Sequence, residues 1–310
     1  MSYRLDPAAP LGEELLRVCD AQAGQAVAAL TERPDGLGEA VHDARKACKR
    51  LRAVLRLARP ALANAYGREN ARYRNAAALL SDLRDADALL ESAGDLRDRL
   101  GGAVKAPLFN RLRRALEARR DARYAAAGDA EALCSDVAAR IDGGRAVLTQ
   151  LDFPDRPEPL VAGLCKTYTR GRKAYRTCRE AQDAAVSEGA EPFHEWRKRV
   201  KYHGYHLRLT AAVWPQEAKL QRKAFKELAD LLGDDHDIAV FLAADAAEGG
   251  FLADPAEAQV LRGALAQRST MLRRAALELG AVLFAEPPSE LAQRLSDLWQ
   301  PGLLAQRDAA

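Results

Sequence analysis

Residues 42–52 read His42-Asp43-Ala44-Arg45-Lys46-Ala47-Cys48-Lys49-Arg50-Leu51-Arg52, and the basic character continues to Arg56 and Arg59. A second stretch, residues 194–201, reads His-Glu-Trp-Arg-Lys-Arg-Val-Lys, with His, Arg, Lys and Lys at the same spacing 152 residues later. Leu55-Arg56-Leu57 likewise returns as Leu207-Arg208-Leu209. The repetition predicts a chain built from two related halves.

Helical geometry gives this spacing a meaning. At about 100° per residue, the basic side chains of the first copy fall within a sector of roughly 80°, apart from an apolar stripe that includes Val41, Leu51 and Leu55. Like charges at i,i+4 destabilise a helix by a few tenths of a kcal/mol per pair, so such a face suits an anion. We define the first basic face as His42, Arg45, Lys46, Lys49, Arg52 and Arg56, and the second as His194, Arg197, Lys198, Lys201 and Arg208.

The composition indicates a helical globular protein. Hydrophobic residues make up 48% of the 310 residues, charged residues 29% and aromatic residues only 6%, which favours helices over sheets. Because 47 Lys and Arg are balanced by 44 Asp and Glu, the basic faces reflect distribution and not an excess of positive charge. Five scattered cysteines without a CxxC pair argue against a disulfide framework or a zinc site. We find no signal peptide and no membrane-length apolar run, and we expect a cytoplasmic protein.

The order of the chain supports two halves of one domain. Prolines at 154, 157 and 159 make residues 153–159 a linker between repeats at 10–152 and 158–300, within a single domain 1–310. Each half places aspartates after its basic residues, so that Arg84-Asp85-Ala86-Asp87 aligns with Asp234-Asp235-His236-Asp237. We expect helices at 11–31, 38–63, 66–91, 107–149 with breaks near Gly128 and Gly143, 160–186, 192–214, 216–246, 255–284 and 288–299.

The predicted fold class is therefore all-α: two four-helix bundles related by pseudo-twofold symmetry. Symmetry would let the two basic faces line a shared central groove or channel. Three further cations, from the basic stretches of the helices at 66–91, 160–186 and 216–246, complete the candidate anion site: Arg72, Lys173 and Arg222.

The two His-x-x-Arg-Lys-x-x-Lys motifs, each followed about 40 residues later by an Asp-rich segment, resemble the CHAD domain, the conserved-histidine α-helical domain. The resemblance implies two four-helix bundles around a basic channel, binding of inorganic polyphosphate, and association with polyphosphate granules in bacteria. It implies that the two basic faces line this channel. The second half departs from the pattern at Asp234, where Arg is expected. The Glu-x-Glu-x-Lys motif of the metalloenzyme domain often fused to CHAD domains is absent from the sequence.

Other functions remain open from the residues alone. His236 and Asp237 form a His-Asp pair that a metal-dependent phosphohydrolase would use, although such a site needs several more ligands and the first half has Ala86 at the matching position. A nucleic-acid-binding module is disfavoured because few aromatic residues accompany the basic faces to stack on bases. We expect a non-enzymatic polyphosphate-binding protein without metal or cofactor. His203 and His206 lie at i,i+3, and we assign them a structural role.

Overall fold

The computed structural model describes residues 3–100, 106–126, 128–181, 190–213 and 215–307, and within these ranges the regular structure is entirely α-helical, as predicted. In the described part of the chain, no helix has both the length and the apolar character to cross a membrane. The helices are α1 (Leu11–Glu32), α2 (Gly36–Leu57), α3 (Arg59–Leu79), α4 (Ser81–Leu100), α5 (Ala106–Ala126), α6 (Ala130–Asp142), α7 (Arg145–Leu148), α8 (Glu158–Glu180), α9 (Ala190–Leu209), α10 (Pro215–Ala247), α11 (Pro255–Leu283) and α12 (Pro288–Arg307).

Several predicted helix boundaries are wrong: α4 and α12 extend to Leu100 and Arg307, beyond the predicted ends at 91 and 299. Two further errors concern how α2 passes to α4. The predicted helix 38–63 ends earlier, at Leu57, because Pro60 occupies the first turn of α3, where its missing N–H costs nothing. The predicted helix 66–91 is divided at Leu80 into α3 and α4. The predicted breaks near Gly128 and Gly143 are present. Residues 182–186 and 214, at the ends of two predicted helices, lie outside the described residues.

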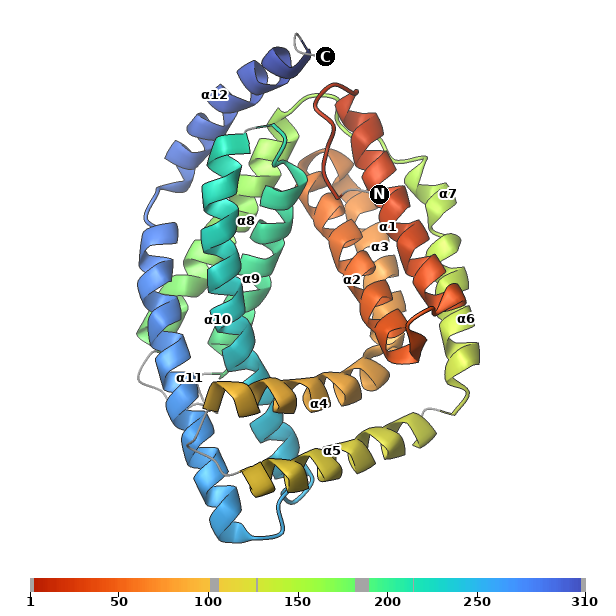
Figure 1. The fold of residues 1–310 in the computed structure, drawn as a ribbon. Coiled ribbons are helices and arrows are strands. Elements are labelled where there is room, and N and C mark those ends of the chain that lie inside the picture. The colour runs from red at the N-terminus through yellow and green to blue at the C-terminus, as the bar shows by residue number, and fades with distance from the viewer. Residues whose placement is uncertain (1–2, 101–105, 127, 182–189, 214, 308–310) are drawn as a thin grey trace.

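Most helices pack with others from their own half. In Figure 1, α1, α2, α3 and α6 form one column, while α8, α9, α10 and α12 form the other, with α11 alongside. Across the halves, α2 contacts α8 and α9, α3 contacts α8, and α4 and α5 leave the first column and pack against α10 and α11 of the second half. A separate small core holds this junction together, with Leu89, Leu112, Phe241 and Leu265 all buried. The two halves are therefore joined at a second place, which adjoins the main core along α10, where Leu231 packs against both.

The first joint between the halves is tightly packed. A Cβ added to Gly163 of α8 would lie well inside contact distance of the Leu57 carbonyl at the end of α2, so only glycine permits this approach. The buried His206 of α9 donates from Nε2 to the carbonyl oxygen of Ala53 in α2, at 3.0 Å. The backbone N–H of Leu5 donates to the carbonyl of Leu209, at 2.9 Å. These contacts fix α2 and α9 relative to one another.

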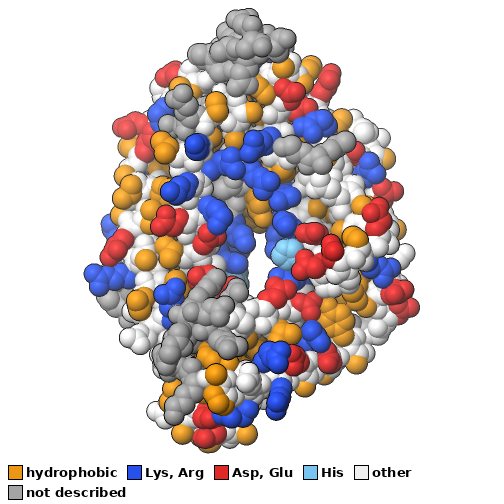
Figure 2. All heavy atoms as spheres, in the orientation of Figure 1, with side chains coloured by type: hydrophobic (Ala, Val, Ile, Leu, Met, Phe, Trp, Pro, Cys, Tyr) orange, Lys and Arg blue, Asp and Glu red, His pale blue; other side chains and the backbone are white. Residues whose placement is uncertain are grey.

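Between the two joints, the molecule is open. Figure 2 shows an opening that passes between the two columns, with Lys and Arg side chains gathered along its upper margin and over α9 and α10. The chain therefore forms a ring of helices, and the opening is where the two basic faces are expected.

Candidate functional site

The two basic faces lie on helices that are anchored by their opposite sides. In α2, the apolar stripe is fully buried, including Val41, Leu51 and Leu55. In α9, Trp196 and Val200 are buried in the same way. Burial of these side chains fixes the rotation of each helix about its axis, so the basic residues are held on the other side.

The structure brings the two faces together. Lys201 and Arg197 of α9 are close enough to Lys49 of α2 to help lower the pKa of its ammonium to about 8, together with burial, which is the larger cause, and with Arg45 and Arg84. The pKa of Lys201 is also lowered to about 8, by burial first and then by Arg197. Two helices from opposite halves thus present like charges to one shared space.

Lys49 has the environment of a side chain that lines an enclosed opening. It is exposed to solvent although protein surrounds it closely enough to disfavour its charge. In the described part of the chain, its ammonium donates no hydrogen bond and forms no ion pair. Asp237 and Asp230 offset part of the repulsion at Lys201. An anion between the two lysines would remove the repulsion that the free protein carries.

The arginines of the first basic face have structural roles as well. Arg45 donates through Nη1 to the carbonyl of Ala77, at 3.2 Å, and to Oγ of Ser81, at 2.7 Å, across the break between α3 and α4. Arg52 donates from Nε to Oδ1 of Asn70, at 3.2 Å. Arg56 lies over the ring of Tyr202 of α9, 3.6 Å from its centroid. These residues therefore connect α2 to its neighbours while retaining N–H groups for a ligand.

The lysines next to the central pair are arranged alike in both halves. Lys46 forms an ion pair with Asp43 at 3.2 Å, and Lys198 forms one with Glu195 at 2.7 Å, each with a spacing of i,i+3. All four side chains are at least a third exposed, so these pairs are weak and can exchange for an anion.

The two repeated histidines have different surroundings. Burial and the charges of Arg84 and Lys46 lower the pKa of His42. His194 contacts His236 of α10, with the two Nδ1 atoms 3.0 Å apart and the rings stacked at 4.3 Å between centroids. One ring must carry the Nδ1 proton and donate it to the other, so the pair shares a single proton at this contact. Burial, Arg197 and His194 lower the pKa of His236 to about 3.

The aspartates of the repeated acidic segments hold arginines in place. Asp235 is buried and accepts hydrogen bonds from Arg273 Nε, at 3.0 and 3.1 Å, and from Ser269. Asp85 and Asp237 favour the charged forms of Arg45 and Arg197, respectively. Among the described residues, no group of three or more His, Cys, Asp or Glu side chains could hold a metal ion. His236 and Asp237 thus take part in the basic site and in no ligand cluster of that part of the chain.

Two more of the candidate residues, Arg72 and Lys173, lie on α3 and α8. Arg72 forms an ion pair with Glu69 at 2.8 Å and packs against Gly144, at the junction of α6 and α7. Lys173 lies on the exposed side of α8, opposite the buried Tyr175. Arg72 is held beside α6 and α7 by these contacts. Lys173 lies on the same side of α8 as Arg170, whose pKa is lowered by burial and by cations that include Arg56 of the first basic face, so Lys173 remains a candidate.

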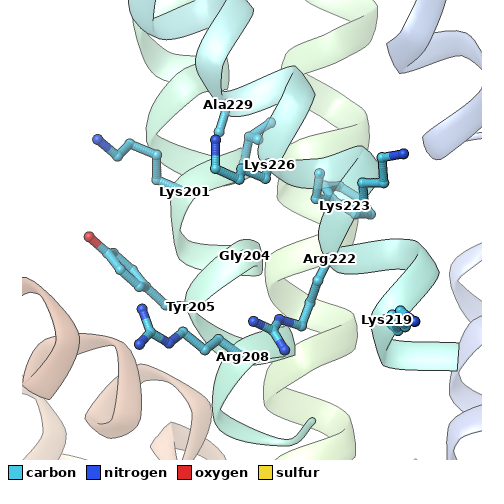
Figure 3. Close-up of a pocket in the computed structure, with 11 residues that line it drawn as sticks. Lys201, Gly204, Tyr205, Arg208, Lys219, Arg222, Lys223, Lys226 and Ala229 are labelled. Carbon is cyan, nitrogen blue, oxygen red and sulfur yellow. The ribbon is translucent and has the colours of Figure 1, made fainter. Parts of the chain in front are cut away.

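Arg222 does approach a residue of the second basic face. Its charge contributes to the lowered pKa of Arg208, after burial and Arg50, and in Figure 3 its guanidinium group points toward the side chain of Arg208. Sequence reasoning missed Tyr202 and Arg84 and did not pair His194 with His236. The repeat gave no signal for the pairing of the two histidines, because the residue that aligns with His236 in the first half is Ala86.

The sequence matches the family model described as "CHAD domain" over residues 21–246. The chain belongs to the CHAD domain family. Its fold is similar to the crystal structure of the CHAD domain from the plant Ricinus communis, with a TM-score of 0.61, 21% identity, and coverage of 92% of this chain and 94% of that one. It is also similar to the structure titled PptA from Streptomyces chartreusis, with a TM-score of 0.54, 19% identity, and coverage of 89% and 98%. A search of curated proteins gave no match.

Membership of the CHAD domain family confirms the family predicted from the two histidine motifs. The matched region includes both motifs and both acidic segments. The two solved structures cover 92% and 89% of this chain, so the similarity of fold extends beyond the residues of the family match.

Proposed function

We propose that this CHAD domain binds inorganic polyphosphate in the opening between its two halves and does not turn it over. The observation that carries the proposal is the opening between the two columns, with Lys and Arg side chains gathered at its margin (Figure 2) and with Lys49 of α2 and Lys201 of α9 close enough for their charges to repel. A linear polyanion relieves this repulsion at many points along its length. Arginine supplies forked contacts to phosphate oxygens and lysine supplies mobile point charges, and the site contains both.

The test is the double charge reversal Lys49→Glu with Lys201→Glu. These lysines are better targets than Arg45, whose side chain also connects α3 to α4. Loss of two charge-assisted contacts of about 1.5 kcal/mol each weakens binding of long-chain polyphosphate by about a hundredfold. The matched control is Arg113→Glu with Arg114→Glu, two exposed side chains on α5 outside the candidate set, which leaves the affinity close to that of the wild type.

Salt dependence gives an independent test of the same proposal. Binding by many phosphate contacts releases counterions, so the logarithm of the affinity falls linearly and steeply with the logarithm of salt concentration. The charge-reversed variant has a shallower slope than the wild type, because fewer contacts remain. An affinity that does not change with salt would exclude the proposed mode of binding.

The two alternative functions are separated by simple assays. A metal-dependent phosphohydrolase that uses His236 and Asp237 would release orthophosphate from polyphosphate with Mg²⁺ or Mn²⁺, and we expect no release. A nucleic-acid-binding module would prefer DNA or RNA in competition with polyphosphate, and we expect polyphosphate to displace both. Polymer binding would direct the protein to polyphosphate granules in the cytoplasm, which co-localisation of a fluorescent fusion with stained granules would test.

A further inference from the structure

A second cationic site adjoins the opening. A groove of about 550 Å³ lies between α9 and α10, and six cations line it: Lys201, Arg208, Lys219, Arg222, Lys223 and Lys226. Its floor comes from Val200, Gly204, Phe225 and Ala229. Figure 3 shows the long side chains arranged around this floor, with the guanidinium group of Arg222 directed toward the side chain of Arg208.

The charge of this groove is not neutralised by the protein. No Asp or Glu is among the described residues that line it, and of its α10 cations Lys226 is paired, with Asp230. Lys219 and Lys223 are exposed and form no ion pair with any of the side chains that the structure describes. Burial first, and then the charges of Arg50 and Arg222, lower the pKa of Arg208. The groove therefore has the electrostatic character of an anion site, because its charges repel one another in the free protein.

The groove is continuous with the opening. Lys201 faces Lys49 across the opening and also lines the groove, and Arg208 belongs both to the second basic face and to the groove. In Figure 2, the Lys and Arg side chains at the opening continue over α9 and α10 without a gap. A flexible chain of phosphates that leaves the opening along α9 meets the groove directly.

The first half has no counterpart of this groove. At the offset of 150 that aligns Asp85 with Asp235, Lys219 and Lys223 correspond to Glu69 and Tyr73. Both of these residues are buried, and Glu69 pairs with Arg72. The extension therefore exists on one side of the opening.

We propose that the α9–α10 groove is an extension of the polyphosphate site that binds the part of a long chain emerging from the opening, and that it makes the protein selective for long chains. This inference rests on the proposed function of the opening. A short oligophosphate fills the opening and makes no contact with Lys219 or Lys223. A long chain contacts both the opening and the groove, so the groove contacts add to its affinity.

The test compares two ligands on one variant. Lys219→Glu with Lys223→Glu changes two exposed side chains on α10, and the exposed pair Arg113→Glu with Arg114→Glu on α5 is the matched control. Affinities for tripolyphosphate and for long-chain polyphosphate are measured by titration calorimetry at one salt concentration, with circular dichroism as the check of helix content. We expect the groove variant to lose at least tenfold in affinity for the long chain while its tripolyphosphate affinity stays within twofold of the wild type.

Each other outcome has a defined meaning. Unchanged affinity for the long chain overturns the extension. An equal loss for both ligands also overturns it, because the groove would then belong to the primary site. If the wild-type protein binds neither ligand, the proposed function itself fails. A loss of helix content would lead to the milder Lys219→Gln with Lys223→Gln variant, judged by the same comparison of the two ligands.

Discussion

Polyphosphate affinity should fall as the pH rises from 7 to 10, because of Lys49 and Lys201. In the free protein, burial and neighbouring cations lower the pKa of each ammonium from an ordinary 10.5 to about 8. A bound anion favours the charged form and returns both pKa values toward 10.5. Between pH 8 and 10.5, the complex therefore binds more protons than the free protein, and linkage requires the affinity to decrease with rising pH in this window.

The size of the effect follows from the same pKa values. One pKa unit corresponds to about 1.4 kcal/mol, so complete recovery would contribute roughly 3 kcal/mol for each lysine. Solvent reaches Lys49, and screening reduces such contributions to about 1 kcal/mol for each lysine. The two together give about 2 kcal/mol, which is a roughly thirtyfold weaker affinity at pH 10 than at pH 7.

The assay is calorimetric titration with long-chain polyphosphate across this pH range at constant ionic strength. The informative control is Lys49→Arg with Lys201→Arg, since guanidinium groups keep their charge throughout the range. This variant should bind with nearly the same affinity at pH 7 and pH 10. The reasoning is refuted if the arginine variant loses affinity as steeply as the wild type, or if the wild type shows no loss.

Three further predictions concern the framework that holds the site. Gly163→Ala should destabilise the protein by about 1–3 kcal/mol in urea unfolding, since its Cβ would overlap the carbonyl at the end of α2, whereas Gly24→Ala, with open space around it, should stabilise α1 by about 0.5–1 kcal/mol. Arg273→Met should cost about 3–5 kcal/mol in the same assay, because it leaves the buried carboxylate of Asp235 without its cation; a neutral change would contradict this. Burial lowers the pKa of His203 from 6.5 to about 3, so only the unfolded chain takes up a proton at this residue between pH 6.5 and pH 3. The free energy of unfolding should therefore fall by about 2 kcal/mol between pH 7 and pH 5. This fall should be smaller in His203→Gln.

The sequence predicts the basic faces well, because they depend on local helical geometry. Spacing at 3.6 residues per turn places Lys49 and Lys201 on solvent-facing sides of two amphipathic helices, and duplication implies that the helices are equivalent. Their facing orientation required an argument from symmetry, which the electrostatic coupling of the two lysines now supports.

The path of the chain after α3 was not predictable in the same way. The break at Leu80 contains no proline or glycine, and it coincides with the hydrogen bonds from Arg45 to Ala77 and Ser81. Such a tertiary contact leaves no periodic pattern in the sequence. The consequence is large, because α4 then crosses to the second half and the ring of helices is closed there.

Charge in a sequence also does not show which cations are free. Arg72 and Arg222 look equivalent in their repeats, yet the first pairs with the buried Glu69 and the second lines an open groove. Arg72 is neutralised by a residue three positions earlier in its own helix, whereas the surroundings of Arg222 are set by the opposing helix α9. The first basic face has more cations in its sequence, but several of them hold helices together.

The most direct test of the central claim is a crystal structure of the protein with bound polyphosphate. The account predicts phosphate density between α2 and α9, with oxygens within hydrogen-bonding distance of both Lys49 and Lys201 Nζ. Phosphates bound on the outer faces of α3 or α8, with the space between these two lysines filled only by water, would contradict it.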